Sequence, residues 1–176
     1  MIDVSVFTPK TVYVTYIAAT PEQVWQALTD PAFSKRYFFG FAVAVEPREG
    51  GAFRLHDPDG RIHASGEVVA WDPPRRFSST WIVEGMGGFD ALPACLVTYD
   101  IEWSGESVKV TMTESHSWNV PDAILSGGRS GWPAVMCNLK TLLETGKTLS
   151  IAPEGPPPEM VEAVKKAVIE KPWLKR

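Results

Sequence analysis

The sequence predicts an α+β fold in which a curved antiparallel sheet of about seven strands wraps around one long C-terminal helix. Three observations predict it. A strand pattern near the N-terminus leads into two small helices, a run of six strand-length segments follows, and the last strong apolar periodicity is helical. The 176 residues suffice for one such domain. Because a twisted sheet and a straight helix leave space between them, this order also predicts a central pocket.

The first strand is expected at residues 10–18, where side chains of the two faces alternate along the chain. A helix should follow at once, because Thr20 and Gln23 have the spacing of a capping box and a proline occupies the first helical position. The same arrangement of a capping residue and a proline recurs at Asp30, so a second short helix is expected to run to about Lys35.

The middle of the chain is expected to be entirely β. Turn signals rich in glycine, proline and aspartate divide it into strand-length segments. The expected strands are 41–46, 51–56, 61–71, 76–83, 95–103 and 107–116. Their short connections favour an antiparallel meander, in which one face of the sheet packs on a core.

The long helix is predicted by apolar residues at helical spacing from Trp132 to Leu143, with Gly146 as its C-terminal stop. Its start is left open, because a helix that begins at Pro121 would be broken or kinked by the glycines and Pro133 that follow. We expect one domain over residues 1–150. Residues 151–176 are expected to be a proline-rich linker and a short amphipathic helix, appended to that domain and covering either it or a neighbour.

Composition excludes several classes of function. The net charge of −4 argues against a nucleic-acid partner, and no apolar run approaches the roughly 20 residues that span a bilayer. Two isolated cysteines, with no CxxC pair and no secretory leader, favour a cytoplasmic protein. Seven tryptophans beside three histidines indicate an aromatic interior with few general acid–base groups.

A set of short stretches carries a resemblance to a known family. The chain contains, in this order, YIAATPEQVWQALTDP (16–31), GGAFRL (50–55), GEVVAWDPPRRFSSTW (66–81), KVTMTES (109–115) and GWPAVMCNLKTLLETG (131–146). Together they resemble the START-like (SRPBCC) superfamily, and within it the bacterial relatives of the activator of heat-shock-protein-90 ATPase (AHSA-type). The resemblance implies a helix-grip fold with a hydrophobic cavity between the sheet and the long helix. Because the superfamily includes lipid carriers, hormone receptors, polyketide cyclases and co-chaperones, it leaves the function open.

Strand alternation selects the side chains that would line this cavity. The candidate ligand-binding residues are Phe77, Trp81, Tyr99, Trp103, Val110, Met112, Glu114, His116, Trp132, Met136 and Leu139. Among them, the hydroxyl of Tyr99, the carboxylate of Glu114 and the imidazole of His116 could meet at the pocket mouth. There they could orient a polar group of a ligand or act as acid and base. An alternative stays open, in which the apolar side chains form a dry core and the glutamate lies at its rim.

The sequence assembles no catalytic or metal site. It has no GxSxG elbow and no phosphate-binding loop, and Cys137 lies among core positions of the long helix, where a thiol is usually inert. His56 and His63 flank a DPDG turn, but turn chemistry explains those aspartates and no third histidine or cysteine stands at ligand spacing. We therefore expect no metal and no cofactor.

The leading prediction is a protein that binds a hydrophobic or aromatic small molecule in its central cavity. Two alternatives follow from the resemblance. One is a co-chaperone-like interaction protein that stimulates a heat-shock chaperone ATPase in the stress response. The other is a polyketide cyclase-like enzyme that uses Tyr99, Glu114 or His116 as acid–base groups. A homodimer is possible with each of these three functions, and the sequence does not decide the oligomeric state.

Overall fold

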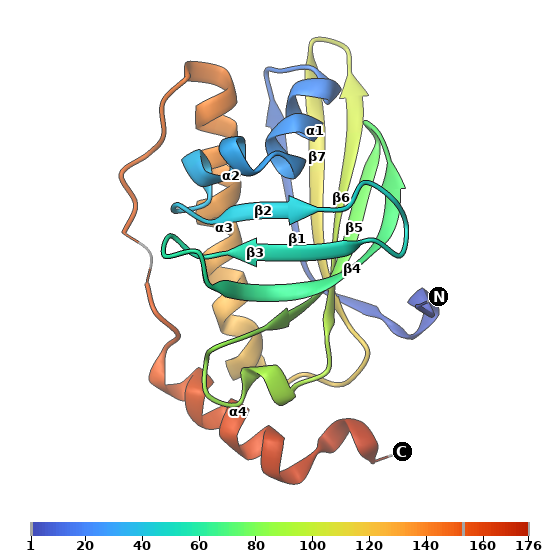
Figure 1. Cartoon of the computed structure of the whole chain (residues 1–176), viewed down its shortest axis with the longest axis vertical. Helices are drawn as coiled ribbons and strands as arrows, with labels where there is room; N and C mark the ends of the chain where they lie inside the picture. Colours follow the sequence, from blue (N-terminus) through green and yellow to red (C-terminus); the bar gives the residue numbers. More distant parts are fainter. Residues whose placement is uncertain (1, 153, 176) are drawn as a thin grey trace.

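A seven-stranded antiparallel sheet curls around one long helix in the computed structural model of the chain (Figure 1). The structure describes residues 2–152 and 154–175. The strands are β1 (Thr8–Ile17), β2 (Ala42–Val45), β3 (Ala52–His56), β4 (Ile62–Asp72), β5 (Arg76–Val83), β6 (Cys95–Ser104) and β7 (Ser107–His116). The helices are α1 (Pro21–Thr29), α2 (Pro31–Tyr37), α3 (Asp122–Thr145) and α4 (Pro158–Glu170), with short 3₁₀ turns η1 (Val4–Val6), η2 (Phe89–Ala91) and η3 (Pro172–Leu174).

The sheet confirms the predicted architecture. Its strand order is β1-β7-β6-β5-β4-β3-β2, so the N-terminal strand closes the meander at one edge by pairing with β7. The strands begin and end within two residues of the positions expected from alternation and turn signals. The main core lies between the inner face of the sheet and α3, which makes this an α+β fold of the helix-grip kind.

The two short helices form through the caps that the sequence predicts. The Thr20 hydroxyl accepts the Gln23 N–H at 3.2 Å, and the Gln23 side chain accepts the Thr20 N–H at 2.9 Å. Asp30 caps α2 by accepting the Ala32 N–H at 2.7 Å. This helix runs past the expected end to Tyr37, which is buried and whose hydroxyl donates to a carbonyl oxygen of α1.

The long helix is a single continuous element. It begins directly after Pro121 and passes through its glycines and Pro133 without a break, so the longer of the two possible starts is correct. Pro133 has no N–H to donate, yet buried side chains on both sides of it hold the helix against the sheet. Gly146 ends the helix with a positive φ of 73°, and its N–H donates to the Leu142 carbonyl oxygen at 2.8 Å.

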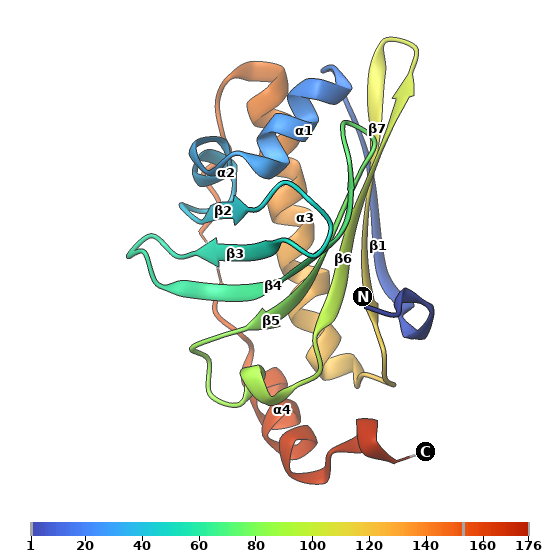
Figure 2. The same cartoon turned by 45° about the vertical axis from the view of Figure 1, so that its right-hand side comes forward.

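The C-terminal helix packs on its own chain. α4 crosses one end of the domain beside η2 and the first turns of α3 (Figure 2). There it closes a second apolar cluster, whose buried members are Phe89, Trp118, Val120, Ile124, Leu125, Val164 and Ala167. Of the two surfaces that this helix is expected to cover, its own domain or a neighbour, the structure shows the first, because the apolar face of α4 completes a core of this chain. In the described part of the chain, no helix has the length and apolar character needed to cross a membrane.

Candidate functional site

Aromatic rings from several elements meet between the sheet and α3. Trp81 of β5 and Trp132 of α3 pack edge to face, with ring centroids 5.5 Å apart. Phe38, which follows α2, stacks on Trp81 at 6.5 Å and meets Trp132 edge-on at 6.1 Å. Phe53 of β3 lies 4.8 Å from Trp81 on another side. The rings thus fill the space in which the sequence predicts a cavity.

A polar group of three side chains, here called the Glu114 cluster, lies beside these rings and consists of Glu114, His116 and Trp132. The Trp132 indole N–H donates to Oε2 of Glu114 at 2.6 Å, and Nε2 of His116 lies 2.8 Å from Oε1. Because an ionised carboxylate can only accept, we assign the imidazole proton to Nε2. Glu114 is only 7% exposed, and each of its two carboxylate oxygens accepts a hydrogen bond from a ring N–H group.

One polar atom of the cluster has no protein partner. Nδ1 of His116 is buried and makes no hydrogen bond within the described residues. With the proton on Nε2, Nδ1 is an acceptor, so the cluster retains the capacity to bind one hydroxyl or N–H group.

A pair of glycines on α3 shapes the wall around this cluster. A Cβ at Gly128 would lie 2.5 Å from Oε2 of Glu114, so only glycine lets the helix approach the carboxylate this closely. A Cβ at Gly127 would instead lie 2.6 Å from Sδ of Met160 in α4. Sequence reasoning treated these glycines only as possible helix breakers. Their signal was a glycine pair within an otherwise regular apolar helix pattern.

Two further ionisable groups of the interior are held in their neutral forms. Burial raises the pKa of the Cys95 thiol, and the nearby Glu114 carboxylate raises it further. Burial also raises the pKa of the Tyr99 hydroxyl, whose ring stacks on Phe77 with centroids 6.3 Å apart. Because a thiol with a raised pKa is a poor nucleophile, this arrangement does not activate Cys95 for covalent catalysis.

The structure brings most of the predicted site residues together. The residues that lie in or against the main core are Phe77, Trp81, Tyr99, Val110, Met112, Trp132, Met136 and Leu139, with Glu114 and His116 joined to Trp132 as described. The predicted interaction between the Tyr99 hydroxyl and the Glu114 carboxylate is not found among the described residues. Tyr99 pairs with Met112 in the sheet whereas Glu114 pairs with Val97, and within the described residues the Tyr99 hydroxyl bonds to neither Glu114 nor His116.

Trp103, another residue predicted to line the pocket, lies at the surface and not between the sheet and α3. Alternation places it on the same face of β6 as Ile101, which is buried, but Trp103 is 56% exposed. The β6–β7 hairpin extends beyond the helices that cover the inner face (Figure 1). The expectation that Trp103 faces the central space is therefore wrong, because the covering layer ends before the strand does.

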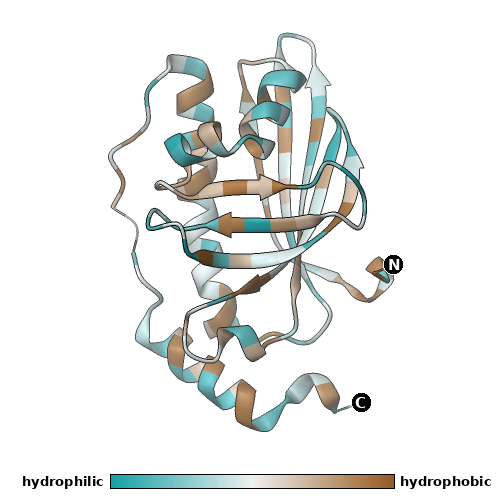
Figure 3. Ribbon diagram, in the orientation of Figure 1, coloured by the Kyte–Doolittle hydropathy of each residue, from teal (hydrophilic) through white to brown (hydrophobic). Residues whose placement is uncertain are grey.

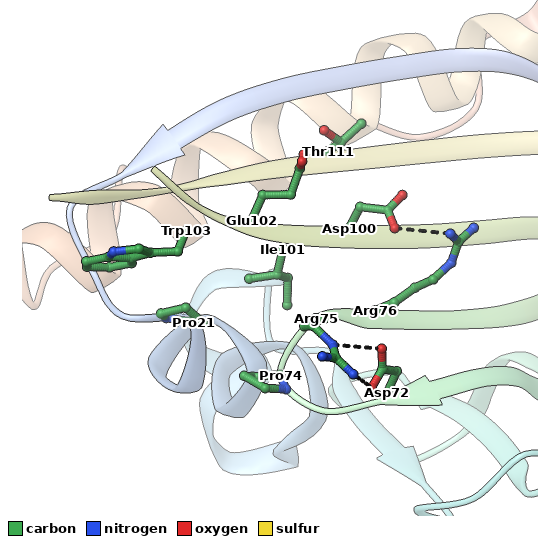
Figure 4. A pocket seen from close by; sticks show the side chains of 10 residues that line it. All are labelled: Pro21, Asp72, Pro74, Arg75, Arg76, Asp100, Ile101, Glu102, Trp103 and Thr111. Carbon is green, nitrogen blue, oxygen red and sulfur yellow. Dashed lines mark hydrogen bonds and ion pairs between the residues drawn. The ribbon is translucent and has the colours of Figure 1, made fainter. Parts of the chain in front are cut away.

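Trp103 borders a groove on the surface (Figure 4). The groove has a volume of about 640 Å³ and is lined by Pro21, Asp72, Pro74, Arg75, Arg76, Asp100, Ile101, Glu102, Trp103 and Thr111. Two ion pairs lie among these residues, with N–O distances of 2.9 Å for Arg75 and Asp72 and 3.4 Å for Arg76 and Asp100. A second, smaller hollow of about 390 Å³ lies on the outer side of α4. Both hollows open to solvent, and neither lies between the sheet and α3.

The histidines of the β3–β4 hairpin do not form a metal site. His63 packs its ring on Phe41 with centroids 4.8 Å apart, and partial burial lowers its pKa against the opposing effect of Asp57. Nδ1 of His56 lies 3.4 Å from the Gly60 carbonyl oxygen. Among the described residues, no group of three or more His, Cys, Asp or Glu side chains is placed to hold a metal ion.

Comparisons with known proteins agree with this fold. Residues 18–144 match the family described as Activator of Hsp90 ATPase homolog 1-like protein. The structure of CalU16 from Micromonospora echinospora is similar with a TM-score of 0.63 and 21% identity, over 93% of this chain and 92% of that chain. DynU16, from the dynemicin biosynthetic locus, has a TM-score of 0.66 and 25% identity, over 78% of this chain and 48% of its own.

A third similar structure is the Aha1 dimer from Colwellia psychrerythraea, with a TM-score of 0.62 and 18% identity over 77% of this chain and 96% of that chain. No curated protein sequence matches this chain.

Proposed function

The chain belongs to the family of Activator of Hsp90 ATPase homolog 1-like proteins, and we propose that it binds a hydrophobic or aromatic small molecule between the sheet and α3. The Glu114 cluster carries this proposal. Burying a carboxylate costs several kcal/mol unless it is well paired, and well-packed apolar side chains of the same volume often stabilise a core as much. A buried carboxylate, imidazole and indole among aromatic rings are therefore better explained by recognition of a ligand than by packing.

The chemistry of the cluster suggests what the ligand carries. The rings of Phe38, Trp81 and Trp132 would supply apolar and stacking contacts, and Nδ1 of His116 would accept a hydroxyl or N–H. At about 25 cal/mol per Å², a ligand that loses roughly 200 Å² of apolar surface gains about 5 kcal/mol before entropic costs. The origin of DynU16 in a biosynthetic locus agrees with a small organic ligand for a protein of this fold.

We test this proposal with naphthalene and 1-naphthol, which differ by one hydroxyl. We expect the unchanged protein to bind 1-naphthol about tenfold more tightly, which corresponds to about 1.4 kcal/mol for the added hydrogen bond. In Glu114→Gln the amide cannot accept from both ring N–H groups, so the imidazole loses its fixed tautomer. The hydroxyl of 1-naphthol could then meet an Nδ1–H only as an acceptor, so the preference should become smaller. Isothermal titration calorimetry measures both affinities.

Glu102→Gln is the matched control for the Glu114 cluster, because Glu102 is exposed and forms an ion pair with Lys109. It should leave both affinities unchanged. Equal affinities for the two compounds in the unchanged protein, or no saturable binding of either, would refute a ligand site at the Glu114 cluster.

A second candidate function is interaction with a heat-shock chaperone, and the groove at Trp103 supports it. Trp103 is exposed in a groove that Arg75 and Arg76 also line, and tryptophan and arginine are residue types enriched in binding hot spots. If the protein stimulates chaperone ATP turnover, we expect Trp103→Ala to raise the concentration of protein needed for half-maximal stimulation about 30-fold. This factor corresponds to about 2 kcal/mol of binding free energy. Leu174→Ala, at an equally exposed position on the C-terminal turn, is the control. Turnover that does not respond to the protein at all would eliminate this role.

The enzymatic alternative has less support, because within the described residues the Tyr99 hydroxyl bonds to neither Glu114 nor His116, and its pKa is raised. The cytoplasmic location and a homodimer stay predictions. Two unpaired cysteines agree with a reducing compartment.

A further inference from the structure

α4 lies across one end of the domain, outside the residues that match the family. It bridges two parts of the chain, the β5–β6 loop that carries η2 and the first turns of α3 (Figures 1 and 2). Val164 is 0% exposed at the centre of this contact. A Cβ at Gly88 in the loop would lie within 3.7 Å of both Val164 and Val168, which shows how closely the loop approaches α4. α4 thus ties the loop to the long helix.

The elements that α4 contacts also contact the Glu114 cluster. The β5–β6 loop runs from Val83, which packs against the α4 contact, to Cys95, which packs against the main core and pairs with Trp81. On α3, Gly127 faces Met160 of α4 and the adjacent Gly128 faces Glu114. Two adjacent residues of α3 therefore lie against α4 and against the buried carboxylate.

The contact of α4 with the rest of the domain is confined to one side of the helix. One apolar stripe holds it, and the opposite side carries Ile169, which is 82% exposed, and the ion pair of Lys165 with Glu162. Figure 3 shows hydrophobic and hydrophilic residues alternating along α4. The preceding described residues, 147–152 and 154–157, form no regular element.

The buried indole N–H of Trp118 also favours separation of α4 from the domain. Nε1 of Trp118 is buried with no hydrogen-bond partner in the described structure, and its ring packs edge-on against Trp173 with centroids 5.3 Å apart. An unsatisfied buried N–H is unfavourable, and water could satisfy it once α4 and η3 move away. The closed state therefore carries a cost that the open state relieves.

We propose that α4 is a gate that swings away from η2 and α3 while the sheet stays folded, and that small molecules reach the Glu114 cluster through the end it uncovers. In the closed state aromatic rings pack between the sheet and α3 and the two hollows described above are on the surface, so an opening at this end would give a ligand a way in. The use of this gate for a ligand rests on the proposed function, whereas the opening itself can be measured without one.

The thiol of Cys95, a partly buried residue that packs against the main core, reports access to this end of the interior. In a Cys137→Ser background, Cys95 is the remaining cysteine, and its labelling by N-ethylmaleimide is followed by intact mass. Val164→Asp places a carboxylate in the α4 contact, so we expect labelling at least tenfold faster while the circular dichroism of the sheet is retained. Ile169→Asp, the same change on the exposed side of α4, should alter the rate less than twofold.

Hydrogen exchange of the unsubstituted protein gives a second measurement that needs no variant. Amides of α4 should exchange through a local opening, at least tenfold faster than the most protected amides of β6 and β7. Exchange of α4 as slow as that of β6 and β7 would overturn the gate, even if Val164→Asp does not fold. A second outcome would also overturn the gate. In it, the α4 amides of Val164→Asp are unprotected, yet Cys95 is labelled at the same rate as in the protein with Val164.

The gate and the ligand site can fail separately. If Val164→Asp accelerates the labelling of Cys95 but neither protein binds 1-naphthol, the gate stands and the ligand proposal falls. If 1-naphthol binds with the same association rate constant in the Val164→Asp and Ile169→Asp proteins, the ligand site stands and α4 does not control its access.

Discussion

Gly66→Ala is expected to remove about 3 kcal/mol or more of the free energy of unfolding, at the upper end of what one added methyl group costs in a packed site. Gly66 lies in β4, where the neighbouring strand β5 approaches without room for a side chain. A Cβ at this position would lie 1.7 Å from the Thr80 carbonyl oxygen and 2.5 Å from its carbonyl carbon. Because both obstacles are backbone atoms, relief requires the two strands to separate. That separation would also break the bond from the Glu67 N–H to the Thr80 hydroxyl.

Urea denaturation of Gly66→Ala and Gly131→Ala measures the effect with a matched control. At Gly131 an added Cβ meets nothing within 4 Å, and the residue lies inside α3. Alanine is the better helix former by about 1 kcal/mol, so Gly131→Ala should be slightly stabilising. A Gly66→Ala protein within 1 kcal/mol of the unsubstituted one would contradict the close approach of β4 and β5. The net stability of a domain is only about 5–15 kcal/mol, so the expected loss should also lower the yield of folded protein.

The comparison of Gly66 with the strands around it separates what the sequence could predict about the fold from what it could not. The strands were predictable because alternation and turn residues are local signals, and β5 and β7 begin and end where those signals place them. The cap of Thr20 on α1 was predictable for the same reason. The reason for glycine at position 66 is different, because it depends on a carbonyl group of another strand that no local pattern specifies.

The same limit explains what was missed at the candidate site. Alternation correctly gave the face of Trp103, but exposure depends on how far the covering helices extend, and the β6–β7 hairpin passes beyond them. It also gave Tyr99 and Glu114 one face, but a shared face does not specify which side chains form hydrogen bonds with one another. The apolar stripe of α4 predicted burial of Val164 but not which surface would bury it. Each missing fact is a distance between elements remote in sequence.

Trp132→Phe is expected to destabilise the protein by about 2–4 kcal/mol. The substitution removes the indole N–H that donates to Oε2 of Glu114 at 2.6 Å and leaves that oxygen buried without its partner, at a cost of about 1–3 kcal/mol. The smaller ring also loses part of its contact with Phe38 and Trp81. Trp81→Phe is the control, because it makes the same change in ring size but loses only a bond of 2.9 Å to the neutral Ser79 hydroxyl. It should cost about 1 kcal/mol less.

A double-mutant cycle with Glu114→Gln separates the charge from the packing. In Trp132→Phe/Glu114→Gln no charged oxygen is left unpaired, so the double variant should be at least about 1 kcal/mol more stable than the sum of the single losses predicts. Chemical denaturation of all four proteins gives the coupling free energy. Losses that add to within about 0.5 kcal/mol would show that the indole contributes only its volume. A clear coupling would mean that the core holds a charged hydrogen-bond system at a stability cost, which a protein evolved only to pack would have little reason to retain.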